Sequence, residues 1–246
     1  MKQFFEQCPE VAIAFSGGVD SAYLLYAASQ YAKRVKAYYV NSAFQPQFEL
    51  DDAVRLAREL GAEMEILDVD ILCHDAVATN PADRCYHCKK VLFSEIIKAA
   101  KGDGFDVLLD GTNASDDASD RPGMRAIAEL SVRSPLRECG LTKDAIRQQS
   151  RESGLFTHDK PAYACLATRI PVGERITAEK LQRTEFAEDY LTALGFRDFR
   201  VRSMGDMAKI QVREKDLELA MTRRKEILNE LKKHYTGVLL DLEVRK

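Results

Sequence analysis

One six-residue segment, Ser16-Gly17-Gly18-Val19-Asp20-Ser21, constrains the fold of this chain more than any other part of it. The apolar residues 11–15 before it predict a buried strand, and residues 21–28 after it carry apolar side chains at helical spacing. Adjacent glycines let a strand-to-helix turn bend sharply and present bare N–H groups to an anion. The helix that follows directs its positive N-terminal end to the same place. With the Ser16 and Ser21 hydroxyls as further donors, the segment predicts a phosphate-binding loop.

Strands and helices alternate after this loop. Helices are predicted at residues 21–34 and 48–60, the second ended by Gly61, and strands at residues 35–40, 64–69 and 106–109. This alternation is typical of the α/β class with a doubly wound parallel sheet. In such sheets ligands bind beyond the carboxyl ends of the strands, which is where residues 16–21 lie.

The pattern changes in the last third of the chain. Helices at 177–194 and 217–234 and strands at 199–202, 208–213 and 237–244 predict a small α+β block. We therefore expect a large domain over residues 1–172 and a small one over residues 173–246, whose strands are candidates for contacts in a homo-oligomer. Arg200 and Arg202 point to the same face of one strand, which predicts either a phosphate contact or a solvated charged face.

Composition excludes several classes of protein. A net charge of −3 over 246 residues does not suggest a nucleic-acid partner. No apolar run is long enough to span a membrane, and the N-terminal residues lack the apolar core of a signal peptide. We expect a cytoplasmic protein, in which the six cysteines are thiols or metal ligands rather than disulfides.

Two stretches interrupt the regular pattern. Residues 80–90, Asn-Pro-Ala-Asp-Arg-Cys-Tyr-His-Cys-Lys-Lys, are expected to form a turn before a helix that begins near Val91. Within them Cys85 and Cys88 have a spacing that suits two thiolates on one metal centre, but also zinc or redox chemistry. Residues 159–175 contain two prolines and a glycine and predict a bent loop, in which Cys165 and Arg169 are candidate functional residues; a domain linker is the alternative.

The loop at residues 16–21 lacks the spacing and the lysine of a Walker A motif and instead resembles the S-G-G-x-D-S fingerprint of the PP-loop ATP pyrophosphatases. The resemblance implies that this loop holds the pyrophosphate of ATP. Because a Cβ excludes positive φ, we predict that a side chain at Gly17 or Gly18 blocks the anion site. Gly111 and Thr112, followed by acidic residues at 116 and 117, resemble a second nucleotide-contacting segment of these enzymes. An ordinary tight turn and a capped loop are the alternatives for the two segments.

The stretches around residues 80–90 and 164–169 resemble the LarE family of ATP-dependent sulfur transferases. The resemblance implies that ATP adenylates a carboxylate of a pyridinium dicarboxylate mononucleotide, that sulfur then displaces AMP, and that the product serves the synthesis of a nickel-pincer nucleotide cofactor. For the adenylation we expect Asp20 to organise Mg²⁺, or else to cap the helix. Arg169 is expected to contact the acyl-adenylate or a substrate phosphate.

Two sulfur sources are implied by the same resemblance. In one branch of the family a cysteine that matches Cys165 gives up its own sulfur, and in another three cysteines hold an iron–sulfur cluster. We predict that Cys85, Cys88 and Cys165 bind a 4Fe–4S cluster, with Cys165 as sole donor or a zinc site as alternatives. A PP-loop tRNA thiolase, an amide-forming synthetase and a zinc-stabilised nucleotide-binding module without activity are the competing functions.

Overall fold

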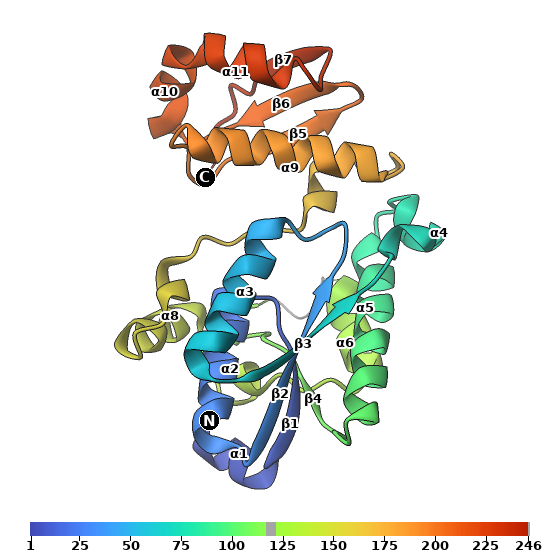
Figure 1. Ribbon diagram of the computed structural model, residues 1–246, viewed down its shortest axis with the longest axis vertical. Coiled ribbons are helices and arrows are strands. Elements are labelled where there is room, and N and C mark those ends of the chain that lie inside the picture. The colour runs from blue at the N-terminus through green and yellow to red at the C-terminus, as the bar shows by residue number, and fades with distance from the viewer. Residues whose placement is uncertain (117–121, 246) are drawn as a thin grey trace. The chain divides into compact units, whose positions relative to one another are not determined.

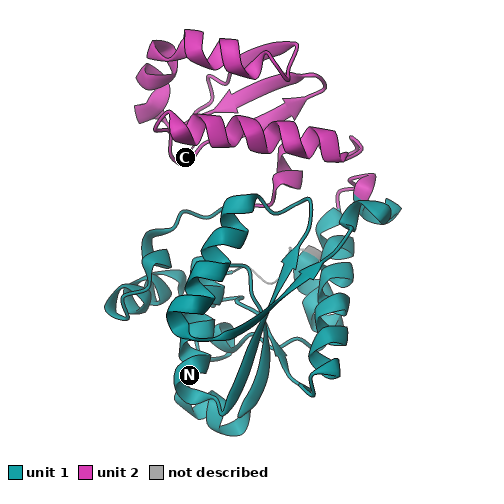
Figure 2. Ribbon diagram, viewed as in Figure 1, with its two compact units in different colours: residues 1–77, 83–163 teal, residues 78–82, 164–246 magenta. Residues whose placement is uncertain are grey.

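The computed structural model describes residues 1–116 and 122–245, so Asp117 lies outside the described residues. The chain divides into two compact units, Met1–Val77 with Asp83–Tyr163, and Ala78–Ala82 with Ala164–Lys246 (Figure 2). The main boundary between the two units falls after Tyr163. The functional division into residues 1–172 and 173–246 stays a prediction.

A four-stranded parallel sheet forms the centre of the N-terminal unit, as the alternation of strands and helices predicts (Figure 1). Its strands are β1 (Glu10–Ala14), β2 (Arg34–Asn41), β3 (Glu63–Asp68) and β4 (Leu108–Leu109), in the order β3-β2-β1-β4. The first three strands are added in one direction, whereas β4 returns to the other side of β1. The direction in which strands are added to the sheet therefore reverses between β1 and β4. Such a switch point opens a crevice at the carboxyl ends of the two strands.

Helices cover both faces of this sheet (Figure 1). On one face pack α1 (Lys2–Gln7), α2 (Val19–Tyr31), α3 (Gln47–Leu60), α7 (Pro135–Glu138) and α8 (Lys143–Glu152). On the other pack α5 (Arg84–Gly102) and α6 (Pro122–Glu129). Shorter helical turns are η1 (Ile71–Cys73), α4 (Asp75–Ala78) and η2 (Phe156–Asp159). In β1, Val11 and Ile13 face the first group and Ala12 the second, so alternate residues of a continuous apolar strand fill two cores.

The predicted start of α5 was wrong. The helix begins at Arg84, so Cys85 and Cys88 lie on its first turns and not in a turn before it. The bend that the sequence signals ends earlier, where Asn80 takes a φ of 55° next to Pro81. From Arg84 onward no glycine or proline occurs until Gly102, and nothing opposes a helix.

The C-terminal unit is a small α+β fold, as predicted (Figure 2). Its elements are η3 (Leu166–Arg169), α9 (Ala178–Ala193), β5 (Arg200–Met204), β6 (Met207–Gln211), η4 (Glu214–Asp216), α10 (Leu217–Thr222), α11 (Arg224–Leu231) and β7 (Gly237–Leu240). β5 and β6 pair antiparallel and β6 and β7 parallel. The predicted helix over 217–234 is two helices, because Arg223 (φ −88°, ψ 5°) leaves helical geometry between them.

The buried side chain of Asn80 ties the segment 78–82 to this unit. Its side-chain amide donates to the carbonyl oxygens of Ile170 and Pro171, at 3.2 and 2.7 Å, and the backbone carbonyl of Asn80 accepts from the Gly173 N–H. Within the described ranges, no helix combines the length and apolarity that crossing a membrane requires.

Candidate active site

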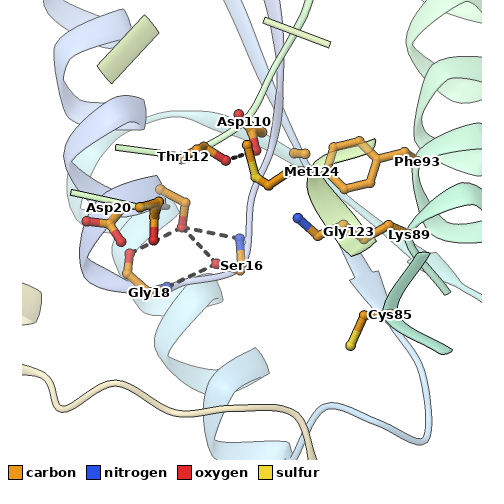
Figure 3. Close-up of a pocket in the computed structure, with 14 residues that line it drawn as sticks. Ser16, Gly18, Asp20, Cys85, Lys89, Phe93, Asp110, Thr112, Gly123 and Met124 are labelled. Atoms are coloured by element: carbon orange, nitrogen blue, oxygen red, sulfur yellow. Dashed lines mark hydrogen bonds between the residues drawn. The ribbon is translucent and has the colours of Figure 1, made fainter. Parts of the chain in front are cut away.

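A cavity of about 530 Å³ lies in the N-terminal unit, at the crevice between β1 and β4 (Figure 3). The segments after β1 and β4 form one side of it, and α5 and α6 the other. The lining residues are Ala14, Ser16, Gly18, Asp20, Ser21, Cys85, Lys89, Phe93, Asp110, Gly111, Thr112, Asp116, Gly123 and Met124. The predicted phosphate loop and the predicted Gly111–Thr112 segment therefore meet in one cavity.

The loop at residues 16–21 is held by its own hydroxyls. The Ser16 and Ser21 hydroxyls lie 3.0 Å apart, and the Ser21 hydroxyl donates to the Gly18 carbonyl at 3.2 Å. Gly17 has a φ of +69°, as its predicted role requires. Gly18 does not: its φ is −76°, where it serves as the N-cap of α2, so the expectation of positive φ at both glycines was wrong for this one.

Gly111 marks the point of closest approach between the two segments. A Cβ built on Gly111 would lie 2.9 Å from the backbone nitrogen of Ser21, closer than side-chain carbons come to backbone atoms. Beside it, the buried Thr112 hydroxyl donates to the Asp110 carboxylate, whose other oxygen accepts from Ser134 at 2.6 Å. The strand ends at β1 and β4 can pack this tightly only because position 111 has no side chain.

Asp20 occupies the first turn of α2 and lines the cavity. One carboxylate oxygen accepts from the Lys143 ammonium at 2.6 Å, while the other is buried and has no hydrogen-bond partner among the described residues. An unpartnered carboxylate oxygen beside a phosphate loop fits the oxygen ligands of Mg²⁺, which also takes phosphate oxygens and water. Among residues 1–116 and 122–245, no group of three or more His, Cys, Asp or Glu side chains is arranged as a metal site.

Two lysines that the sequence did not single out flank the loop. Lys143, at the start of α8, pairs with Asp20, and Lys160 donates to the carbonyl of Gly17 at 3.3 Å while pairing with Asp52 at 2.6 Å. Both come from segments more than a hundred residues further along the chain. Only the fold brings them to the loop, so no local motif could have identified them.

Cys85 lines the cavity from α5, and Cys88 follows one helical turn later. The Arg84 guanidinium lies 3.5 Å from the Cys85 sulfur. Lys89, on the same helix, also lines the cavity; burial lowers its pKa, while Asp110 and the Cys85 thiol oppose that shift. Six cysteines lie in the described ranges, and none of them forms a disulfide.

Cys165 belongs to the C-terminal unit, where it is the N-cap of η3. Arg169, at the end of that turn, is 1% exposed and donates to both carboxylate oxygens of Glu188, at 2.8 and 2.9 Å, and to the Ala164 carbonyl. Glu188 also accepts from the Val201 N–H of β5. A buried, bidentate pair of this kind is costly to break and fixes the backbone on both sides of Cys165.

Arg200 and Arg202 differ in their surroundings although they share one face of β5. Arg200 is buried and donates to the Phe199 carbonyl at 2.6 Å. Arg202 donates to the carbonyl of Thr168 and the amide oxygen of Gln211, and no carboxylate of the described residues lies within ion-pair distance of it. Burial and the neighbouring Arg169 lower the pKa of Arg202. An anion at Arg202 would supply the missing negative charge.

Comparison with known proteins identifies the family. The chain is 35% identical over 206 residues to the pyridinium-3,5-bisthiocarboxylic acid mononucleotide synthase of Lactiplantibacillus plantarum. The matched residues cover 83% of this chain and 75% of that enzyme. The chain belongs to the LarE family. As a LarE-type PP-loop protein it is an ATP-dependent sulfurtransferase, which excludes the module without activity.

Other similarities agree with this assignment. An uncharacterised protein of Synechocystis sp. is 38% identical over 216 residues, 86% of this chain and 80% of that protein. The model of the queuosine biosynthesis protein QueC matches residues 10–83 of this LarE chain, which contain the phosphate loop. The tRNA-specific 2-thiouridylase MnmA of Thermotoga maritima is 29% identical over 145 residues, but this covers only 48% of the chain and 40% of the thiouridylase.

Proposed function

We propose that this sulfurtransferase adenylates a carboxylate of pyridinium-3,5-dicarboxylate mononucleotide and replaces AMP with sulfur, as a step toward a nickel-pincer nucleotide cofactor. One observation supports the two-stage reaction best: the phosphate loop and the Cys85 thiol line the same cavity. The similarity to the L. plantarum synthase supports the choice of substrate.

In the first stage, a carboxylate oxygen of the substrate attacks the α-phosphorus of ATP and the bond to pyrophosphate breaks. The N–H groups of the loop at residues 16–21 and the hydroxyls of Ser16 and Ser21 bind the departing pyrophosphate. Asp20 would hold Mg²⁺ through its unpartnered oxygen, and when bound the ion supplies positive charge to the leaving group. Gly111 and Thr112 form the neighbouring wall, where the rest of the nucleotide would lie.

In the second stage, a sulfide equivalent attacks the carbonyl carbon of the acyl-adenylate, the bond to the AMP oxygen breaks and a thiocarboxylate remains. We propose Cys85, Cys88 and Cys165 as ligands of a 4Fe–4S cluster. Cys85 and Cys88 fit two of the ligand positions, because a spacing of three residues places both thiols on one side of α5. When bound, a cluster with one iron free of protein ligands supplies a place for exogenous sulfide.

The C-terminal unit would provide contacts to the substrate phosphate. We propose Arg202 as the main contact, since its guanidinium has no carboxylate partner in the described chain, with Arg200 beside it. The contacts of Arg169 favour a positioning role, because Arg169 holds the turn after Cys165 in place through its ion pair with Glu188. These contacts lend no support to the predicted contact between Arg169 and the acyl-adenylate. We further propose a cytoplasmic homo-oligomer that takes a small nucleotide substrate, because reactive thiols stay reduced in the cytoplasm.

Mass spectrometry tests this function. The protein is incubated without air with pyridinium-3,5-dicarboxylate mononucleotide, ATP, Mg²⁺ and sulfide, after reconstitution with iron and sulfide. We expect pyrophosphate, AMP and a product in which sulfur replaces carboxylate oxygen. Pyrophosphate release that depends on tRNA but not on the mononucleotide would contradict the proposal.

The cluster has its own test. Reconstitution should give an iron–sulfur absorption that Cys85→Ala, Cys88→Ala and Cys165→Ala each weaken or abolish, whereas Cys139→Ala, a change at an exposed cysteine outside these motifs, should leave it unchanged. Dehydroalanine at position 165 after one turnover, with no iron bound, would instead identify Cys165 as the consumed sulfur donor.

A further inference from the structure

Lys89 lies on the wall of the cavity that α5 forms, across from Ser16 and Gly18 (Figure 3). It follows Cys85 by four residues, so both side chains lie on the same face of the helix. Gly123 of α6 covers its stem: a Cβ at Gly123 would lie 2.9 Å from the Lys89 Cδ and 3.1 Å from its Cε. The helix pair therefore encloses the stem of Lys89 along the cavity wall.

The amine at the end of this stem lacks the partners that the nearby lysines have. From the described residues, no hydrogen bond or ion pair reaches Lys89 Nζ, whose nearest described aromatic contact is the Phe93 ring at 5.9 Å. Lys90 pairs with Glu129, Lys143 with Asp20 and Lys160 with Asp52. A partly buried amine without a partner destabilises the ligand-free protein, and a ligand that supplies an anion removes the cost.

The two walls of the cavity offer different groups to a nucleotide. The loop at residues 16–21 has the N–H groups and hydroxyls suited to the terminal pyrophosphate. On the α5 wall, Lys89 supplies an amine to a phosphoryl group that extends from the loop into the cavity. During adenylation the α-phosphoryl group is the centre on which both the attacking carboxylate and the departing pyrophosphate act, so a cation there favours the transition state.

We propose that Lys89 binds the α-phosphoryl group of the nucleotide, both in ATP and in the acyl-adenylate. This inference rests on the proposed ATP-dependent adenylation and adds to it a contact that is separate from the pyrophosphate site. Lys89 thereby lies on the same wall as the Cys85 thiol, one helical turn away (Figure 3), and would hold AMP there while sulfur replaces it.

The test compares AMP, which offers only an α-phosphoryl group, with pyrophosphate and with adenosine by titration calorimetry. Lys89→Met keeps the length of the stem and removes the charge. We expect AMP to bind about 10- to 100-fold more weakly, as for the loss of one charge-assisted hydrogen bond, while affinities for pyrophosphate and adenosine change less than about threefold. Substrate-dependent pyrophosphate release should fall at saturating ATP, since the contact acts in the transition state.

Controls separate this role from a structural one. Lys90→Met removes the neighbouring lysine, which forms an exposed pair with Glu129, and should leave all three affinities unchanged. The melting temperature of ligand-free Lys89→Met should equal or exceed that of the original protein, since an unpartnered amine is lost. Lys89→Arg keeps a cation and should retain more AMP affinity than Lys89→Met. If Lys89→Met fails to fold, Lys89→Arg alone tests the proposal. A loss of pyrophosphate affinity equal to the loss of AMP affinity in Lys89→Arg would contradict a contact to the α-phosphoryl group that is separate from the pyrophosphate site.

The outcomes distinguish the proposed adenylation from the proposed role of Lys89. If the unaltered protein binds neither AMP nor pyrophosphate, the proposed adenylation itself is wrong. If it binds both, and Lys89→Met binds AMP as tightly as before, only the assignment of Lys89 is overturned.

Discussion

Gly17 and Gly18 allow the phosphate loop to be tested with the same chemical change at adjacent positions. At Gly17 an added methyl group meets two obstacles: the φ of +69° is unfavourable for alanine, and the Cβ would lie 3.2 Å from both the Ala53 Cβ and the Glu49 carbonyl oxygen of α3. The left-handed conformation costs about 1–2 kcal/mol. Displacing a packed helix by a few tenths of an ångström adds about 1 kcal/mol.

The expected loss of stability for Gly17→Ala is therefore about 2–3 kcal/mol. In a unit of this size, that lowers the melting temperature by roughly 4–12 °C. Gly18→Ala should cost less, about 1 kcal/mol at most, because φ is −76° and the nearest neighbour of the new Cβ is the flexible Ser16 hydroxyl at 3.4 Å, so only the poorer N-cap preference of alanine remains.

Thermal unfolding of the ligand-free variants measures the stability difference, and titration with pyrophosphate measures the anion site. Gly17→Ala can relieve its strain only by turning its φ negative, which redirects the loop N–H groups, so pyrophosphate affinity should fall at least about tenfold. Equal melting temperatures for the two variants, or unchanged pyrophosphate affinity in Gly17→Ala, would refute the loop geometry described above.

Three further predictions concern other parts of the chain. Gly111→Ala places a Cβ 2.9 Å from the Ser21 nitrogen, so it should lower the melting temperature and weaken ATP binding measured by calorimetry. Gly140→Ala changes an exposed glycine with a φ of 70°, where a Cβ would have no neighbour within 4 Å, so it carries a backbone cost but should leave ATP binding unchanged. Arg202→Ala should raise the KM for the mononucleotide, with little change in melting temperature; the opposite result would assign Arg202 to the fold. Hydrogen bonds from Lys36 and Tyr38 lower the pKa of Asp103, so its carboxylate stabilises the fold above the usual aspartate pKa and loses this effect as pH falls through the lowered value. Between about pH 5 and pH 3, Asp103→Asn should accordingly lose less stability than the original protein in acid unfolding curves.

The sequence predicted the parallel sheet and the phosphate loop because both have local signals. A continuous apolar strand, two glycines and a largely apolar helix lie within residues 11–31, and each supports the same interpretation. Gly61, predicted to end a helix, does so with a φ of 62°. Thr142 and Thr177 cap α8 and α9 with their hydroxyls, a role for which threonine next to a helix is a local signal.

Other features depend on contacts between distant segments and have no local signal. Lys143 and Lys160 reach the loop only through the folding of α8 and the segment after it. Arg169 resembled a ligand-binding residue because arginine in a bent loop suits phosphate, but its partner, Glu188, is nineteen residues away on α9. The start of α5 was mistaken since cysteine and histidine so near a proline resemble a loop, whereas the helix simply begins after the bend.

The placement of Cys85 and Lys89 on one face of α5 bears on how the two stages of the reaction are linked. A helix is rigid over a single turn, so the backbone positions that carry the Cys85 thiol and the Lys89 amine keep the same separation whichever ligand occupies the cavity. If Lys89 holds the α-phosphoryl group, AMP departs beside the wall that carries Cys85 and not toward the phosphate loop. The pyrophosphate of the first stage and the AMP of the second are then released from opposite walls of one cavity. We therefore expect added pyrophosphate to inhibit adenylation by competing with ATP at the loop, while added AMP inhibits through Lys89, and the two inhibitors to bind together without excluding each other.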